Sequence, residues 1–80
     1  MNKREKFLNQ LPLGSFGVIK GLFSQGDTRR RMLDLGLIYG TKIRVLQQNF
    51  AGNLTAYQVR GAVIAFRIED AATILVESTV

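Results

Sequence analysis

The chain has 80 residues, of which 46% are hydrophobic and 21% charged, a balance typical of one small folded domain and not of a disordered chain. Cysteine and histidine are absent, which excludes disulfides, thiolate metal sites and the side chains that most often act as nucleophile or proton shuttle near neutral pH. Eleven Lys and Arg against six Asp and Glu give a net charge of +5. An anionic partner is therefore expected: nucleic acid, an acidic protein surface or an anionic membrane face.

The first residues are too polar and too broken for a secretory signal, and no apolar run approaches the ~20 residues of a membrane span. A cytoplasmic protein without membrane insertion is the expectation. Asn2 and Glu5 match a capping box. Residues 1–10 are therefore predicted to form a short N-terminal extension or helix, which Pro12 ends.

The first strand is predicted over residues 16–23, a run of β-forming side chains. Gly17 and Gly21 lie inside this run. Glycine within a strand is typical of a bulge or of sharp coiling, as in a small barrel.

A helix of about eight residues is predicted next, too short to be stable in water without packing. Asp27 is the expected N-cap. Gly36 fits the left-handed position after the helix, with Leu37 reaching back to Met32 as in a Schellman motif. The apolar residues of the helix are predicted to be buried: Met32, Leu33 and Leu35.

The charges of this helix are unusual under that assignment. Arg29, Arg30 and Arg31 fall in the first turn, where the positive end of the helix dipole disfavours cations. Asp34 falls near the other end, where an anion is disfavoured. This order predicts that the arginines serve something outside the helix.

Strands follow over residues 42–46, 54–59 and 62–68, with Arg60 and Gly61 as a tight turn between the last two. Five inward-facing side chains are predicted from the alternation: Ile43, Val45, Ile64, Phe66 and Ile68.

A helical turn over residues 69–72 and a last strand over 73–76 complete the chain. The predicted architecture is mainly β: a five-stranded, strongly bent antiparallel barrel with one short helix after the first strand and a helical turn before the last. The whole chain, residues 1–80, is expected to form a single domain.

The arginine run has two interpretations: an edge that binds carboxylates or other anions, or a solvated helix face. Tyr39 also has two: it lines a groove for a peptide, or its ring caps the core while the hydroxyl stays in water. Ile38 beside it shares either role.

Other candidates are weaker. Most aromatic residues that might stack nucleobases are better interpreted as core, with Phe50 on a hairpin tip as the exception; the set is Phe16, Phe23, Phe50 and Tyr57. Glu69 and Asp70 supply too few oxygens for a hard metal and instead favour the start of a helical turn. No glycine loop for phosphates is present, and an enzyme is not expected.

Several segments together resemble the FeoA family, small cytosolic proteins of bacterial ferrous iron transport that share an SH3-like barrel. The segments that carry the resemblance are residues 11–14, 17–19, 31–37, 40–45, 59–61, 64–67 and 71–76. Tyr39 departs from the family pattern, in which proline is usual, and it restores a backbone donor and adds a large side chain.

The resemblance implies a non-catalytic accessory protein that binds and regulates FeoB, a membrane iron transporter with a cytosolic G-protein domain. No cofactor and no metal site are expected, because without His and Cys iron would be held by carboxylates alone. The hypothesis for the partner-binding surface is Arg29, Arg30, Arg31, Leu37, Ile38 and Tyr39.

Three questions stay open at this point. A small basic barrel that binds nucleic acid is the alternative function, although the resemblance implies no nucleic-acid partner. A homo-oligomer that uses an exposed barrel edge is a further alternative. Whether the protein stimulates GTP hydrolysis, assembles the transporter or gates it is also undecided.

Overall fold

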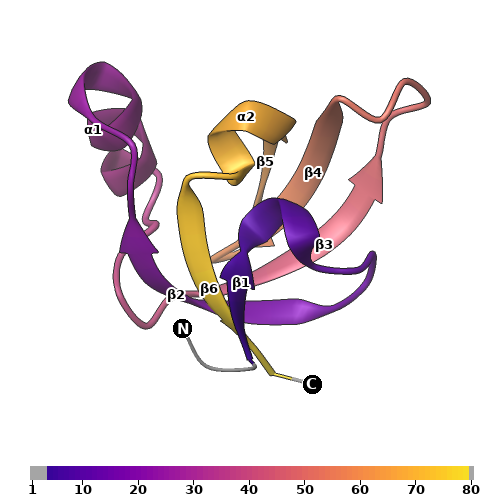
Figure 1. The fold of residues 1–80 in the computed structure, drawn as a ribbon, viewed down its shortest axis with the longest axis horizontal. Coiled ribbons are helices and arrows are strands. Elements are labelled where there is room, and N and C mark those ends of the chain that lie inside the picture. Colours follow the sequence, from indigo (N-terminus) through magenta and orange to yellow (C-terminus); the bar gives the residue numbers. More distant parts are fainter. Residues whose placement is uncertain (1–3, 80) are drawn as a thin grey trace.

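A computed structural model describes residues 4–79 as six antiparallel strands bent around one core, in the order β1-β6-β2-β3-β4-β5 (Figure 1). The strands are β1 (Glu5–Phe7), β2 (Phe16–Leu22), β3 (Lys42–Gln48), β4 (Leu54–Val59), β5 (Ala62–Arg67) and β6 (Ile74–Ser78). The helices are a 3₁₀ helix (Leu8–Gln10), α1 (Gly26–Asp34) and α2 (Ile68–Ala71). None of the helices in this described part is long and apolar enough to cross a membrane.

The mainly β architecture is confirmed, but the predicted number of strands is wrong by one. The additional strand is β1, which pairs with β6, Lys6 lying opposite Val76. Residues 5–7 therefore form a strand, and the predicted short helix is correct only for the 3₁₀ helix at residues 8–10. A strand of three residues is too short for alternation to reveal it. Asn2 of the predicted capping box lies outside the described residues.

Strand β2 joins the two parts of the sheet. It pairs with β3 at one end and with β6 along most of its length. Its register against β6 shifts between Ile19 and Gly21, which confirms the predicted irregularity. Gly17 is needed for a different reason: a Cβ there would lie 3.0 Å from Leu11 Cδ1 and 3.1 Å from Val76 Cβ.

The β4–β5 hairpin turns at Arg60 and Gly61, both with positive φ (51° and 83°), as a two-residue type I′ turn requires. This confirms the predicted turn. Ile64 and Phe66 face inward as predicted, but Ile68 is 41% exposed. The strand alternation ends before Ile68 because α2 begins there.

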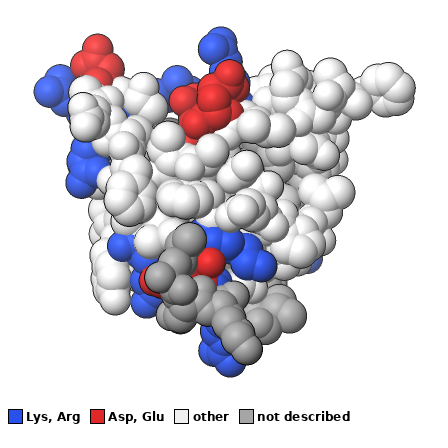
Figure 2. Space-filling model, in the orientation of Figure 1, with Lys and Arg blue, Asp and Glu red and all other residues white. Residues whose placement is uncertain are grey.

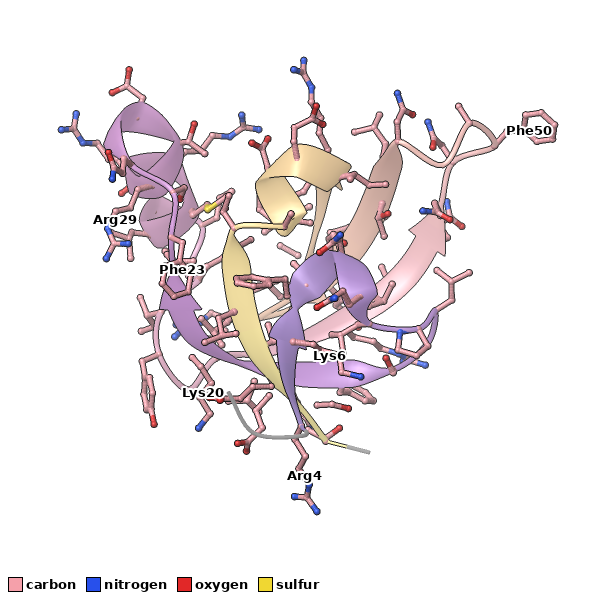
Figure 3. The ribbon with its side chains drawn as sticks, in the orientation of Figure 1. Arg4, Lys6, Lys20, Phe23, Arg29 and Phe50 are labelled. Atoms are coloured by element: carbon pink, nitrogen blue, oxygen red, sulfur yellow. The ribbon has the colours of Figure 1, made fainter. Side chains whose placement is uncertain are left out.

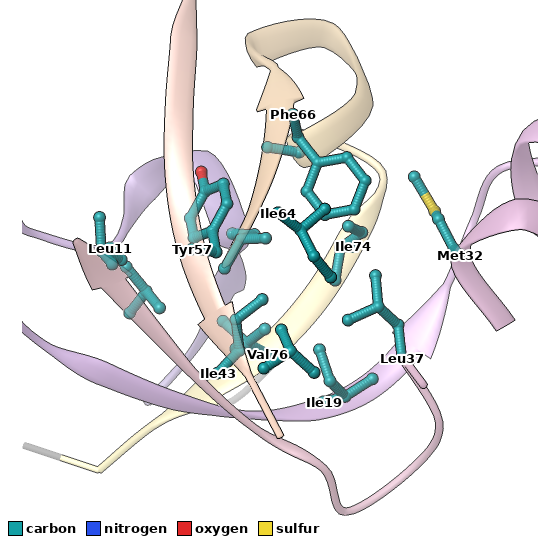
Figure 4. Packing of buried hydrophobic residues seen from close by; sticks show 14 residues of the cluster. Leu11, Ile19, Met32, Leu37, Ile43, Tyr57, Ile64, Phe66, Ile74 and Val76 are labelled. Atoms are coloured by element: carbon teal, nitrogen blue, oxygen red, sulfur yellow. The ribbon is translucent and has the colours of Figure 1, made fainter. Parts of the chain in front are cut away.

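The core is formed by side chains from strands β2 to β6, from the three helices and from the loops that follow the 3₁₀ helix and α1 (Figure 4). Its members are Leu8, Leu11, Ile19, Met32, Leu37, Ile43, Val45, Tyr57, Val59, Ile64, Phe66, Ala71, Ile74 and Val76. Burial raises the pKa of Tyr57, and a hydrogen bond with Thr55 opposes this rise.

Helix α1 begins earlier than predicted. Its N-cap is Gln25, whose side chain makes no capping bond, so the prediction that Asp27 is the N-cap is wrong. Asp27 lies in the first turn and Arg31 in the last, an order that suits the helix dipole. Arg30 and Arg31 therefore lie beyond the first turn, and only Arg29, at the end of that turn, and Asp34 remain unfavourably placed.

The end of α1 agrees with the sequence. Gly36 has φ 94°, its N–H donates to Leu33 O, and the N–H of Leu37 donates to Met32 O, both at 3.0 Å. These two bonds define the Schellman motif. The predicted burial is correct for Met32, partial for Leu35, and wrong for Leu33, which is 42% exposed on the solvent side of the helix.

Candidate functional site

A groove of about 520 Å³ lies between α1 and β5, and we call it the helix–strand groove. Its lining residues are Asp27, Thr28, Arg31, Met32, Leu54, Ala65, Phe66, Arg67 and Asp70. Met32 and Phe66 are almost fully buried, so they form an apolar floor that is continuous with the core. A groove of this size, with an apolar floor between polar and charged walls, is large enough to hold a ligand.

The walls of the groove carry both signs of charge. Arg31 and Arg67 contribute cations, and Asp27 and Asp70 contribute anions. Figure 2 shows acidic side chains of α1 and α2 as two separate groups along one edge of the molecule. Within residues 4–79 none of these four side chains is held in an ion pair, so all four can interact with a bound chain.

The strand wall of the groove is a sheet edge, because β5 pairs with β4 alone. The two-residue turn makes Val59 and Ala62 a hydrogen-bonded pair, and such pairs alternate along an antiparallel ladder. The amides of Val63, Ala65 and Arg67 therefore point away from β4. In the described part of the chain these three amides have no acceptor.

The structure separates the three arginines of the predicted surface. Arg29 Nη1 donates to Leu22 O at 2.7 Å, so this side chain ties α1 to the end of β2, beside Phe23 (Figure 3). Arg30 is exposed and has no partner among residues 4–79. Arg31 alone belongs to the helix–strand groove.

The other three predicted residues lie outside the groove. Tyr39 and Ile38 are 73% and 45% exposed in the loop after α1, so the Tyr39 ring does not cap the core. Lys20 Nζ donates to Tyr39 Oη at 3.4 Å and lies 5.0 Å from the centre of its ring. Leu37 is 0% exposed, and its assignment to the partner-binding surface is wrong because it supports the core instead.

The predicted placement of the aromatic residues is only partly correct. Tyr57 is in the core, and Phe50 projects from the β3–β4 hairpin as expected (Figure 3). Phe23, however, is 63% exposed, with its ring edge-on to Phe7 at 5.8 Å. Phe16 is half-buried on the outer face of the sheet.

A second, smaller hollow of about 180 Å³ opens on that outer face, and we call it the basic hollow. Its lining residues are Phe16, Lys42, Arg44, Gln58, Arg60 and Gly61. Sequence reasoning missed it because the three cations come from two separate segments. The available signal was the alternation of Lys42 and Arg44 with the buried residues of β3.

No three His, Cys, Asp or Glu side chains within the described range are grouped closely enough to hold a metal ion. Glu69 and Asp70 lie in the first turn of α2, where the sequence placed them.

Comparison with known proteins identifies relatives of the whole fold. The family model for the FeoA domain matches residues 7–78. A FeoA-like protein from Clostridium acetobutylicum has 26% identity and a TM-score of 0.87, covering 99% of this chain and 92% of that chain. FeoA from Chlorobium tepidum has 27% identity and a TM-score of 0.87, with 92% and 70% covered. No protein with a curated description matches the sequence.

Two further structures define the fold class. FeoA from Stenotrophomonas maltophilia, solved in complex with zinc and described as an SH3 domain protein, has 25% identity and a TM-score of 0.80, covering 89% of this chain and 88% of that chain. A manganese-dependent transcriptional repressor has 19% identity and a TM-score of 0.81, covering 98% of this chain and 44% of that chain. The fold is therefore SH3-like, as expected.

Proposed function

The chain belongs to the FeoA family, which is linked to ferrous iron uptake, and from this premise we propose that it is a non-catalytic accessory protein that binds the cytosolic domain of a FeoB-type transporter. In this proposal the chain works as a single domain in the cytoplasm, and iron is handled by the transporter. The observation that carries the proposal is the helix–strand groove, with its apolar floor beside an unpaired strand edge.

The groove favours an extended polypeptide segment as its ligand. An extended chain beside β5 can accept hydrogen bonds from the amides of Val63, Ala65 and Arg67, which adds a strand to the sheet. Its side chains alternate in direction, so those on one side reach the floor formed by Met32 and Phe66.

The charged walls then select the sequence of that segment. Arg31 and Arg67 pair with acidic side chains, while Asp27 and Asp70 pair with basic ones. A segment that carries charges of both signs in the matching order is therefore preferred over a uniformly acidic one. This requirement makes recognition specific, because a wrong order places like charges together.

Nucleic acid, the alternative suggested by the net charge, has less support. Base stacking requires exposed aromatic faces next to a basic surface. Tyr57 is buried, and Lys42 and Arg44 already lie over the ring of Phe16. Phe50 is exposed, but it projects alone from a hairpin tip.

The test is a calorimetric titration of the full chain with the transporter's cytosolic domain, using Ala65→Trp and the control Ile38→Trp. Both residues are exposed, but only Ala65 lines the groove. We expect A65W to weaken binding at least tenfold, about 1.4 kcal/mol, because the indole fills the groove, while I38W retains affinity. Equal affinities of wild type and A65W would exclude the groove as the binding site.

A further inference from the structure

We propose that the basic hollow is a binding site for a single phosphate group, separate from the helix–strand groove. Lys42, Arg44 and Arg60 line it, and no acidic side chain does. In the described residues none of these three cations has an acidic partner. Three unpaired like charges around one hollow repel one another, and a bound anion removes that repulsion.

The cations are held in place by packing. Lys42 Nζ lies 4.7 Å and Arg44 Cζ 5.1 Å from the centre of the Phe16 ring, within the range of cation–π contacts. Phe16 lies opposite Arg44 across the β2–β3 ladder, so the register of the sheet fixes this arrangement. Ordering the side chains in advance lowers the entropic cost of binding an anion.

Arg60 is positioned by the end of α1. A Cβ on Gly36 would lie 3.2 Å from Arg60 Cδ and 3.3 Å from Arg60 Nε, so the stem of Arg60 passes directly over this glycine. The glycine thus serves both the Schellman motif and the hollow. Next to Arg60, the space above Gly61 is open, and the amide of Gly61 has no acceptor within residues 4–79.

The size and charge of the hollow select the ligand. At about 180 Å³ it is smaller than the roughly 300 Å³ at which pockets for whole small molecules begin, so it fits one chemical group. A carboxylate carries one negative charge, whereas a phosphate monoester carries about 1.5 to 2 near neutral pH. Two guanidinium groups and one ammonium match the phosphate better, since each guanidinium can bind two of its oxygens.

The phosphate can belong to a soluble monoester or to a lipid headgroup, and the experiment distinguishes these sources. The ¹⁵N-labelled full chain is titrated in low-salt, phosphate-free buffer with inorganic phosphate and with glycerol 3-phosphate. In parallel it is sedimented with vesicles of phosphatidic acid, a lipid phosphomonoester, in phosphatidylcholine, and with vesicles of phosphatidylcholine alone. Each measurement is repeated with Arg44→Gln and with the charge-matched control Arg30→Gln.

We expect the amides of Phe16, Arg44 and Gly61 to shift on titration with inorganic phosphate, R44Q to weaken binding at least tenfold, and R30Q to bind within about threefold of wild type. If only phosphatidic acid vesicles bind, with the same order of variants, the source is a lipid headgroup and the site is still confirmed. Absence of binding in every arm would overturn the proposal. An equal loss in R44Q and R30Q would also overturn it, because binding would then follow net charge alone.

Discussion

The helix–strand groove and the basic hollow belong to one small barrel, yet they differ in size, in position and in the signs of charge that they carry. The groove is about 520 Å³, has a floor continuous with the core and carries both signs of charge. The hollow is about 180 Å³, lies on the outer face of the sheet and carries cations only. The first suits a length of polypeptide and the second a single anionic group. Net charge alone, which first suggested an anionic partner, does not distinguish them.

The largest expected effect is a loss of stability on truncating a core side chain that supports both the groove and the hollow. Leu37→Ala should lower the free energy of unfolding by about 2–5 kcal/mol, because Leu37 is fully buried between α1 and the sheet. The matched change Leu33→Ala, on the exposed side of α1, should alter it by less than about 0.5 kcal/mol. Denaturant unfolding of the two variants measures the difference. A similar loss in both would show that Leu33 is packed after all.

The next expected effect, of Gly36→Ala, concerns the basic hollow more than the helix–strand groove. Gly36→Ala and Gly40→Ala each place a Cβ at positive φ (94° and 88°), which should cost about 1–2 kcal/mol of stability. Only G36A also displaces Arg60, because a Cβ at Gly40 meets no atom within 4 Å. G36A should therefore bind inorganic phosphate more weakly than G40A at equal stability. Equal phosphate affinities of G36A and G40A would show that the end of α1 does not position Arg60 in the hollow.

Smaller effects separate the three arginines by role. Arg29→Ala should lower stability by about 0.5–1 kcal/mol through loss of the bond to Leu22 O. Arg31→Ala should weaken partner binding about fivefold with little change in stability, since it lines the groove. Arg30→Ala should change neither. Thermal unfolding and calorimetric titration of the three variants check this assignment, and a loss of partner affinity in R30A would contradict it.

The smallest expected effect is on the pH dependence of stability. It should not distinguish the groove from the hollow, because Tyr57 lies in the core that both share. Burial raises the pKa of Tyr57 above its ordinary value of 10.0. The folded state then keeps this proton longer than the unfolded state, so the contribution is intact below about pH 10 and is lost as pH rises through the folded-state pKa. Tyr57→Phe should flatten the loss of stability between about pH 9 and pH 11. Denaturant unfolding of wild type and Y57F at a series of pH values measures the difference, and an equal pH dependence of the two would contradict this account.

The sequence predicts those parts of the fold that depend on local pattern. Alternation located β3 to β5, and Arg60 with Gly61 located the hairpin turn, because a type I′ turn demands positive φ at both positions. The Schellman motif was equally readable from Gly36. Strand β1 was missed because it is held by pairing with β6, which lies some 70 residues away in the chain, and not by its own pattern.

The sites were less predictable, because they are assembled from separate segments. The expected surface rested on the arginines lying in the first turn of α1, and the helix starts at Gly26 instead. With that premise corrected, Arg29 is explained by its bond to Leu22 O and Arg31 by the groove. The groove itself is lined by both α1 and β5, an arrangement that no local pattern encodes.

The central claim is that the partner occupies the groove and leaves the hollow free. The most direct measurement is a ¹H–¹⁵N NMR map of the labelled chain as the transporter's cytosolic domain is added. We predict that the perturbed amides cluster at Arg31, Ala65 and Arg67 and that those of Arg44 and Gly61 stay unchanged. Perturbation centred on the basic hollow, with the groove amides unchanged, would contradict it.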